Sequence, residues 1–452
     1  MTARLARLSL AALVALVPVS SAMALRAQTP PTQAAASSRV TETEALVDAL
    51  VARQFPKITA LFDDAMKGAM PDDSLQKAWD GAMVQLGAFA RRGPGREQRR
   101  GTYTAVMVLC DFANGKMDVT FVFSDTGRIA GLQMRPPAPD VSYAPPDYAV
   151  PSAYTDREVT VGGGEWALPG TLSLPAGTGP FSAVVLVHGS GPNDRDESFG
   201  PNKTFKDLAL GLASRGVAVL RYDKRTFVHR AKLDAFTHVT VKEETIDDAL
   251  AAVALLRRDP AIDPAKVFVL GHSLGGMLAP RIAAADPKLA GIIVMAGPVR
   301  SLDQAVFDQY TYLFNADGTV TAAEQKRIDD ARETIAAVAN LTAEDAKSGR
   351  IIGGVPASYW LDLRGFDPAA AAARLPHRIL VLQGARDYQV TVEDFERWKT
   401  GLGGRPNVQF RLYPALNHLF LPGTGKSMPA EYSVPGHVPV EVITDIVGWV
   451  KG

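Results

Sequence analysis

Residues 154–452 alternate between short apolar runs and longer stretches with helical spacing. The run 183–187 (Ala-Val-Val-Leu-Val) is apolar at every position, as expected for a strand that is covered on both faces of its sheet. Four further runs share this pattern, at 217–222, 266–270, 291–296 and 378–382. Alternation of strands and helices is typical of a mostly parallel sheet with helices on both faces. The sequence therefore predicts an α/β fold for residues 154–452.

One segment, at about 301–365, interrupts this alternation between two of the expected core strands. We expect it to form an inserted, largely helical cap. Aromatic side chains are concentrated there; they are Tyr310, Tyr312, Phe314, Tyr359 and Trp360. We interpret them mainly as packing residues of the cap, with one or two lining an acyl pocket as the alternative.

A different pattern precedes residue 154. Helical spacing over 42–67 and 72–89 is followed by three strand-like runs, at 103–109, 117–123 and 129–134. This order predicts a small α+β domain over residues 41–137. The proline-rich stretch that follows predicts a stiff linker over 138–153.

The single cysteine, Cys110, lies in an apolar run, and we expect it to be a small core residue.

The first residues have the pattern of a targeting segment. Two arginines precede an apolar run at 8–19, and the small-residue pattern Ala22-Met23-Ala24 follows it. The run is shorter than the about 20 apolar residues that cross a bilayer. We therefore expect a signal peptide over 1–24, a flexible tether over 25–40, and an exported protein, periplasmic or extracellular, without stable membrane insertion.

A glycine-rich turn joins one apolar run to the helical stretch after it, in the sequence Gly271-His272-Ser273-Leu274-Gly275. A serine in such a strand–turn–helix is held in a strained conformation with its hydroxyl exposed. This context predicts that Ser273 is a nucleophile. The alternative is an ordinary glycine-rich turn with a solvent-facing serine.

A serine nucleophile needs a base, and the base needs an orienting carboxylate. Of the seven histidines, His418 follows the last strand-like run, where a loop would carry it to the carboxyl edge of the sheet. Asp387 follows the run 379–383 in a glycine-containing turn. Folds that carry a serine in this type of turn have their catalytic residues in the order Ser, acid, His along the chain. We predict His418 as the base and Asp387 as the acid, with Asp303 as the rival acid.

Backbone amides are the expected oxyanion donors. We predict the amide of Leu274, directly after the nucleophile, and the amide of Ser190, in the turn 188–191. The loop 193–197 carries three carboxylates and an arginine, and we interpret it as a self-paired buttress of that turn rather than as a metal site. Residues 222–225 (Tyr-Asp-Lys-Arg) should form structural ion pairs, with contact to a substrate carboxylate as the alternative.

In combination, these motifs resemble those of bacterial α/β-hydrolases of the dienelactone-hydrolase and esterase group. The resemblance spans roughly 154–451, and its motifs are His188-Gly189-Ser190-Gly191-Pro192, Asp194-Arg195-Asp196, Tyr222-Asp223-Lys224-Arg225, Gly271-His272-Ser273-Leu274-Gly275-Gly276, Gly384-Ala385-Arg386-Asp387-Tyr388-Gln389-Val390 and Asn417-His418. It implies an α/β-hydrolase fold and a carboxylesterase-like Ser–Asp–His enzyme without a cofactor. Dienelactone hydrolases proper use cysteine where this chain has Ser273, which argues against that exact activity. Residues 42–137 are similar to a small domain of unknown function that precedes such hydrolases in secreted bacterial esterases.

The numbers of basic and acidic residues are balanced. Lys and Arg together number 48, and so do Asp and Glu, which indicates neither a nucleic acid nor an anionic membrane surface as a binding partner.

We expect a small-molecule carboxylic ester as substrate, an acyl-enzyme intermediate, and no cofactor or metal. A serine peptidase is the alternative among enzymes, and a catalytically silent binding module is the alternative from another class. A homodimer is left open, and the N-terminal domain is expected to affect access, partner binding or dimerisation rather than chemistry.

Overall fold

The computed structural model describes residues 38–452 apart from 71, 101–102, 136–142, 234–237 and 317. Contacts divide the described residues into two compact units, 38–135 and 143–452. The expected signal peptide, residues 25–37 of the expected tether and residues 138–142 of the expected linker lie outside the described residues. Residues 38–40, which we assigned to the tether, form the start of the first helix.

The smaller unit combines helices with an antiparallel sheet. Its helices are α1 (Ser38–Val51), α2 (Phe55–Thr59), α3 (Asp64–Ala69) and α4 (Asp72–Leu86). Its strands are β1 (Phe89–Arg92), β2 (Arg96–Arg100), β3 (Tyr103–Phe112), β4 (Gly115–Phe123) and β5 (Ile129–Arg135), all paired antiparallel. Cys110 is fully buried in the core of this unit, and burial raises the pKa of its thiol to about 12. The predicted α+β character is confirmed, although the helical spacing of 42–67 corresponds to three helices rather than one.

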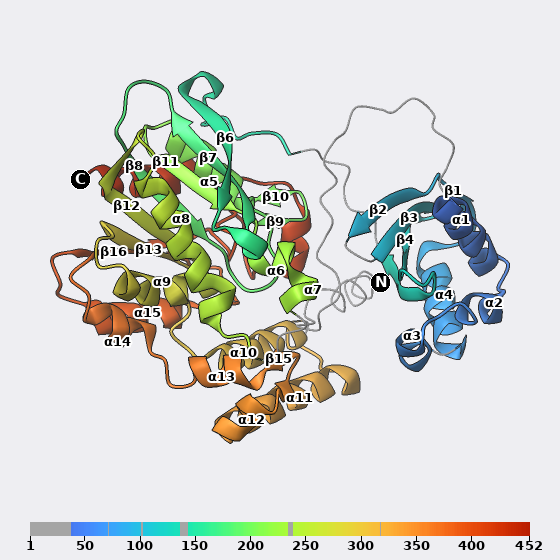
Figure 1. The fold of residues 1–452 in the computed structure, drawn as a ribbon. Coiled ribbons are helices and arrows are strands. Elements are labelled where there is room, and N and C mark those ends of the chain that lie inside the picture. The colour runs from blue at the N-terminus through green and yellow to red at the C-terminus, as the bar shows by residue number, and fades with distance from the viewer. Residues whose placement is uncertain (1–37, 71, 101–102, 136–142, 234–237, 317) are drawn as a thin grey trace. The chain divides into compact units, whose positions relative to one another are not determined.

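The larger unit is built on an eight-stranded sheet (Figure 1). Its strands are β6 (Tyr154–Val161), β7 (Leu168–Pro175), β8 (Phe181–Val187), β11 (Ala218–Tyr222), β12 (Ile262–His272), β13 (Gly291–Met295), β16 (Arg378–Gly384) and β17 (Val408–Tyr413). In the order β17-β16-β13-β12-β8-β11-β7-β6, the first six strands run parallel. At one edge β7 pairs antiparallel with β11, and β6 pairs antiparallel with β7. The predicted mostly parallel sheet is confirmed.

Helices cover both faces of this sheet, which explains its apolar strands. They are α5 (Thr204–Ala213), α8 (Asp247–Arg257), α9 (Leu274–Ala285), α14 (Pro368–Ala373), α15 (Val392–Leu402) and α16 (Val440–Lys451). Two short helices, α6 (Arg225–Val228) and α7 (Arg230–Leu233), follow β11 in the chain. On one face, Val185 and Val187 share a core with α8, α9, α14 and α15. On the other face, Val184 and Leu186 share a core with α5 and α16. Because successive side chains of β8 enter different cores, every position of the run is apolar.

The cap, residues 301–365, lies between β13 and β16 in the chain. Its elements are α10 (Leu302–Phe314), α11 (Ala322–Ala339), α12 (Ala343–Lys347), β14 (Ile351–Ile352), β15 (Val355–Pro356) and α13 (Ala357–Leu363). Figure 1 shows these helices in gold and orange. Trp360 is buried in a small core of the cap, and Tyr312 stacks on Tyr388 with ring centroids 5.1 Å apart. The cap is largely helical, as predicted.

The described part of the expected linker is anchored to the larger unit. The hydroxyl of Tyr143 donates to Asp207 at 2.7 Å, and that of Tyr148 donates to the carbonyl of Val438 at 2.7 Å. Residues 143–153 of the expected linker therefore belong with the larger unit, because the hydroxyls of Tyr143 and Tyr148 find acceptors there. None of the helices in the described part of the chain combines the length and apolarity that crossing a bilayer requires.

Candidate active site

Ser273 lies in the turn between β12 and α9, in a backbone conformation that few residues adopt. Its φ is 53° and its ψ is −118°. A side chain on Gly271 would collide with the carbonyl of Gly275, and one on Gly275 would collide with the carbonyl of Val187. The two glycines therefore let the strand and the helix approach closely. The tight turn between them holds Ser273 in a strained backbone conformation. This is the conformation that presents a serine hydroxyl at the carboxyl edge of the sheet.

Asp387 and His418 follow the neighbouring parallel strands β16 and β17. Nδ1 of His418 lies 2.7 Å from Oδ2 of Asp387, and both side chains are buried. The other carboxylate oxygen accepts from the amides of Gln389 at 2.8 Å and Val390 at 2.9 Å. Because the carboxylate accepts, Nδ1 carries the hydrogen, and Nε2 of a neutral His418 is left as a proton acceptor. Asp303, the rival acid, instead lies in the first turn of α10.

His272 links the loop of His418 to the turn of Ser273. Its Nε2 lies 2.9 Å from the backbone carbonyl oxygen of His418, and the two imidazole rings have centroids 4.7 Å apart. Since His272 directly precedes Ser273, this contact connects the backbone of the His418 loop to the turn that carries Ser273. Sequence reasoning did not find this role, because no local motif indicates which carbonyl a buried histidine will meet.

Glu197 completes this network beneath the active-site turns. One of its oxygens lies 2.9 Å from Nδ1 of His272, in an ion pair that is not aligned well enough for a regular hydrogen bond. Burial lowers the pKa of His272, but the Glu197 carboxylate outweighs it, so the pKa is raised overall. Burial raises the pKa of Glu197, but His272 outweighs it, so that pKa is lowered overall. Both nitrogens of His272 lie close to oxygen atoms, and the Glu197 carboxylate favours the charged form of the ring.

The predicted oxyanion donors lie at the ends of two adjacent parallel strands. Leu274 is the first residue of α9, so its amide has no partner within the helix. Ser190 follows β8, which pairs with β12 as far as Gly271. A Cβ on Gly189 would lie only 3.0 Å from the Cβ of Ser273, which shows how closely the two turns approach. The amide of Gly189 itself donates to Glu197 at 2.9 Å.

The charged loop 193–197 is paired with its neighbours. Arg195 contacts Asp223 at 3.0 Å, and Asp196 pairs with Arg221 and Lys203. Glu197 supports the amide of Gly189, so the loop buttresses that turn as predicted. The expectation that the loop is self-paired is wrong, because the ion-pair partners of Arg195 and Asp196 lie outside it. Within the described ranges, no group of three or more His, Cys, Asp or Glu side chains is placed to hold a metal ion.

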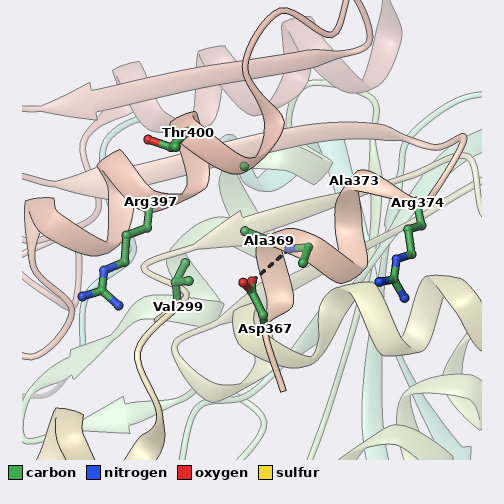
Figure 2. A pocket seen from close by; sticks show the side chains of 9 residues that line it. Val299, Asp367, Ala369, Ala373, Arg374, Arg397 and Thr400 are labelled. Carbon is green, nitrogen blue, oxygen red and sulfur yellow. Dashed lines mark hydrogen bonds between the residues drawn. The ribbon is translucent and has the colours of Figure 1, made fainter. Parts of the chain in front are cut away.

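A surface pocket lies elsewhere on the larger unit, between α14 and α15 (Figure 2). Its lining residues are Val299, Asp367, Ala369, Ala370, Ala373, Arg374, Arg397, Thr400 and Gly401. The Asp367 carboxylate already accepts from the amide of Ala370 at 2.9 Å, and Arg397 pairs with Glu393 at 2.6 Å. None of Ser273, Asp387 and His418 lines this pocket, so we do not assign it to the candidate active site.

Comparison with known proteins agrees with this architecture. A model described as the alpha/beta hydrolase family matches residues 184–433, and a model of a protein of unknown function, DUF3887, matches residues 43–132. The esterase EstD of Thermotoga maritima is 39% identical over 403 residues, which cover 89% of this chain and 93% of that protein. The 2,6-dihydropseudooxynicotine hydrolase of Paenarthrobacter nicotinovorans is 30% identical over 130 residues, which cover 29% of this chain and 32% of that protein. A solved esterase structure from Pyrococcus furiosus is 18% identical with a TM-score of 0.41, covering 70% of this chain and 96% of that chain.

Proposed function

Because this chain belongs to the alpha/beta hydrolase family, we propose that it is an exported serine esterase that cleaves small carboxylic esters through an acyl-enzyme intermediate. The observation that carries the proposal is the arrangement around Ser273. Its strained turn is joined through His272 to His418, and His418 contacts Asp387 at 2.7 Å. Similarity to an esterase over 89% of the chain supports the ester as substrate class.

Acylation begins with the Ser273 hydroxyl. Its oxygen attacks the ester carbonyl carbon while Nε2 of His418 takes the proton, and Asp387 stabilises the resulting imidazolium. The carbonyl oxygen becomes an oxyanion, which the amides of Leu274 and Ser190 stabilise at the positive end of α9. When the carbonyl re-forms, the alcohol leaves with the proton from His418, and the acyl group stays on Ser273.

Deacylation repeats these steps with water as the nucleophile. His418 takes a proton from the water, whose oxygen attacks the acyl carbon, and the same amides stabilise the second oxyanion. Collapse of this intermediate releases the carboxylic acid and returns the proton to Ser273. Every proton transfer uses Nε2 of His418, and water is the one reactant needed besides the ester.

Export is part of the same proposal. It is supported by the order of basic, apolar and small residues over 1–24, which matches a cleaved signal peptide. If the full chain is expressed in a bacterium, the protein recovered from the periplasm should begin at Leu25. N-terminal sequencing checks this, and an uncleaved N-terminus in the cytoplasmic fraction would contradict it.

The catalytic proposal is tested on the purified mature protein with p-nitrophenyl esters and aminoacyl anilides. We expect ester hydrolysis with little anilide hydrolysis, and covalent labelling by a fluorophosphonate that the variant Ser273→Ala does not take up. Faster hydrolysis of the anilides would favour a peptidase. A folded protein that neither hydrolyses esters nor reacts with the probe would favour a binding module.

A further inference from the structure

The two peptide groups on either side of Gly189 are held by buried charged side chains. Nζ of Lys224 donates to the carbonyl of Gly189 at 2.8 Å, while the amide of Gly189 donates to Glu197 at 2.9 Å. Lys224 is only 2% exposed. Asn193 adds a longer bond, at 3.2 Å, to the same carbonyl. An ammonium group is costly to bury unless it is paired, so a lysine at this position needs a reason.

The geometry of the peptide bond supplies that reason. A trans peptide is planar, and its C=O and N–H point in opposite directions. The carbonyl of Gly189 and the amide of Ser190 belong to the same peptide group. By holding the carbonyl, Lys224 therefore sets the direction of the Ser190 N–H, which is one of the two proposed oxyanion donors. Small errors in this direction matter because a donor must be aimed at the oxyanion before the reaction begins.

Lys224 is in turn connected to the cap. Its Nζ lies 2.8 Å from Oε1 of Glu244, in the π-helical turn Lys242–Ile246 that precedes α8. Oε2 of Glu244 accepts from the hydroxyl of Tyr359 at 2.6 Å. Tyr359 belongs to α13, within the cap, and burial raises its pKa well above the ordinary value, so the hydroxyl acts as a donor. The contacts thus form one buried chain from the cap to the oxyanion turn.

We propose that Lys224, Glu244 and Tyr359 are positioning residues that orient the Ser190 amide for oxyanion binding and make this orientation depend on the packing of the cap. The inference rests on the proposed function, since it assumes that Ser190 is an oxyanion donor. It also assigns Tyr359 a role other than lining an acyl pocket. None of the three residues is a catalytic residue, because they act through the Gly189–Ser190 peptide.

The first test replaces the lysine by an uncharged side chain of similar length. In the mature full-length protein, Lys224→Met should lower kcat for a p-nitrophenyl ester by about 10²-fold, the usual cost of losing one oxyanion donor. KM should stay within about threefold. The inhibition constant of a trifluoromethyl ketone, whose adduct with Ser273 carries an oxyanion, should rise in parallel with the loss of kcat. A residue with only a structural role would change the melting temperature without this parallel.

The matched control is Arg225→Met. Arg225 pairs with Asp248 at 3.0 Å, and its replacement removes a neighbouring, partly buried ion pair that does not reach Gly189. If both variants lowered kcat equally, the effect would come from general loosening and the proposal would be overturned. If Lys224→Met left Glu244 unpaired and did not fold, the double variant Lys224→Met/Glu244→Gln, which removes both charges, would be measured instead with the same expectation.

The connection to the cap has its own pair of variants. Tyr359→Phe removes only the hydroxyl that reaches Glu244, and it should lower kcat by about threefold to tenfold with little change in KM. Ser358→Ala removes a neighbouring cap hydrogen bond, to the carbonyl of Val239 at 3.0 Å, and should leave kcat unchanged.

The wild-type protein separates the two levels of proposal. If it hydrolyses esters and reacts with a fluorophosphonate, but folded variants at Lys224 keep kcat and the inhibition constant within threefold of wild type, only the positioning role is overturned. If the wild type does neither, the proposed function fails and this inference falls with it.

Discussion

Nδ1 of His418 and Oδ2 of Asp387 lie 2.7 Å apart although 31 residues separate them in the chain. The contact follows from the pairing of β16 with β17, which places Gly384 beside Tyr413 and brings the loops after these strands together. Two backbone amides hold the other oxygen of Asp387, so the carboxylate has a fixed orientation toward the imidazole. In the proposed reaction, this orientation keeps the hydrogen of His418 on Nδ1 and leaves Nε2 free to accept a proton.

This contact predicts the effect of changing the acid. Asp387→Asn should keep the fold but favour the wrong tautomer of His418, lowering turnover of a p-nitrophenyl ester by about 10⁴-fold. Asp303→Asn, the control for the rival acid, should leave turnover within about twofold. Steady-state kinetics of both variants check this, and a reversed result would move the acid to the loop after β13.

The strained backbone at Ser273 predicts that two variants, both inactive, differ in stability. Ser273→Ala should lower turnover by about 10⁶-fold and leave the melting temperature nearly unchanged. Ser273→Gly should be equally inactive but more stable than Ser273→Ala by about 1 kcal/mol, because glycine adopts a φ of 53° without strain. Urea unfolding compares the two variants. Equal stabilities would mean that the turn stores no strain, and a tenth of wild-type turnover in either variant would remove Ser273 as nucleophile.

The pair of Glu197 and His272 predicts a pH-dependent stability. The raised pKa of His272 gives a contribution that is complete below its ordinary value of 6.5 and is lost as pH rises through the raised value. The lowered pKa of Glu197 gives a contribution that is complete above its ordinary value of 4.5 and is lost as pH falls through the lowered value. The pair should therefore stabilise the fold most between these two values.

Glu197→Gln should then lower the free energy of unfolding by about 3 kcal/mol near pH 5.5, since it leaves a buried charge without its partner. The difference from wild type should shrink as the pH is raised toward 9.5. Urea unfolding at several pH values measures it, with Glu243→Gln as a control, since Glu243 bonds to Thr240 and not to a histidine. A difference that stays constant over this pH range would show that the charge of His272 does not contribute to this stabilisation.

The anchored tyrosines predict where the chain can be shortened. A truncated chain that begins at Tyr143 keeps both tyrosine contacts and should hydrolyse a small soluble ester within about tenfold of the full-length rate, a barrier change of about 1.4 kcal/mol. One that begins at Ser152 loses Tyr143 and Tyr148 and should be less stable by about 3 kcal/mol, since each ring removes apolar surface from water. Thermal unfolding and ester kinetics compare them. A soluble, folded chain from Tyr143 that did not react with a fluorophosphonate would mean that the smaller unit completes the active site.

The sequence by itself determined the fold class and the local backbone geometry around Ser273. The apolar run of β8 predicted a strand with two covered faces, because burial on both sides leaves no position for a polar residue. The glycines around Ser273 predicted a close strand–helix turn, because only glycine allows that approach. Each of these features is formed by residues that are neighbours in the chain, so the sequence alone reveals it. The roles of Ser273, Asp387 and His418 were also proposed in this way and stay predictions until they are tested.

Only the tertiary structure decided which distant residues meet. The order β16-β13-β12-β8-β11 places the ends of separate strands side by side, and that order is set by packing of the whole unit rather than by any motif. It brings Glu197 against His272 and Lys224 against Gly189, and it selects Asp387 rather than Asp303 as the partner of His418. A buried charge is tolerated only where a partner lies within a few ångströms, and such distances exist only once the sheet has formed.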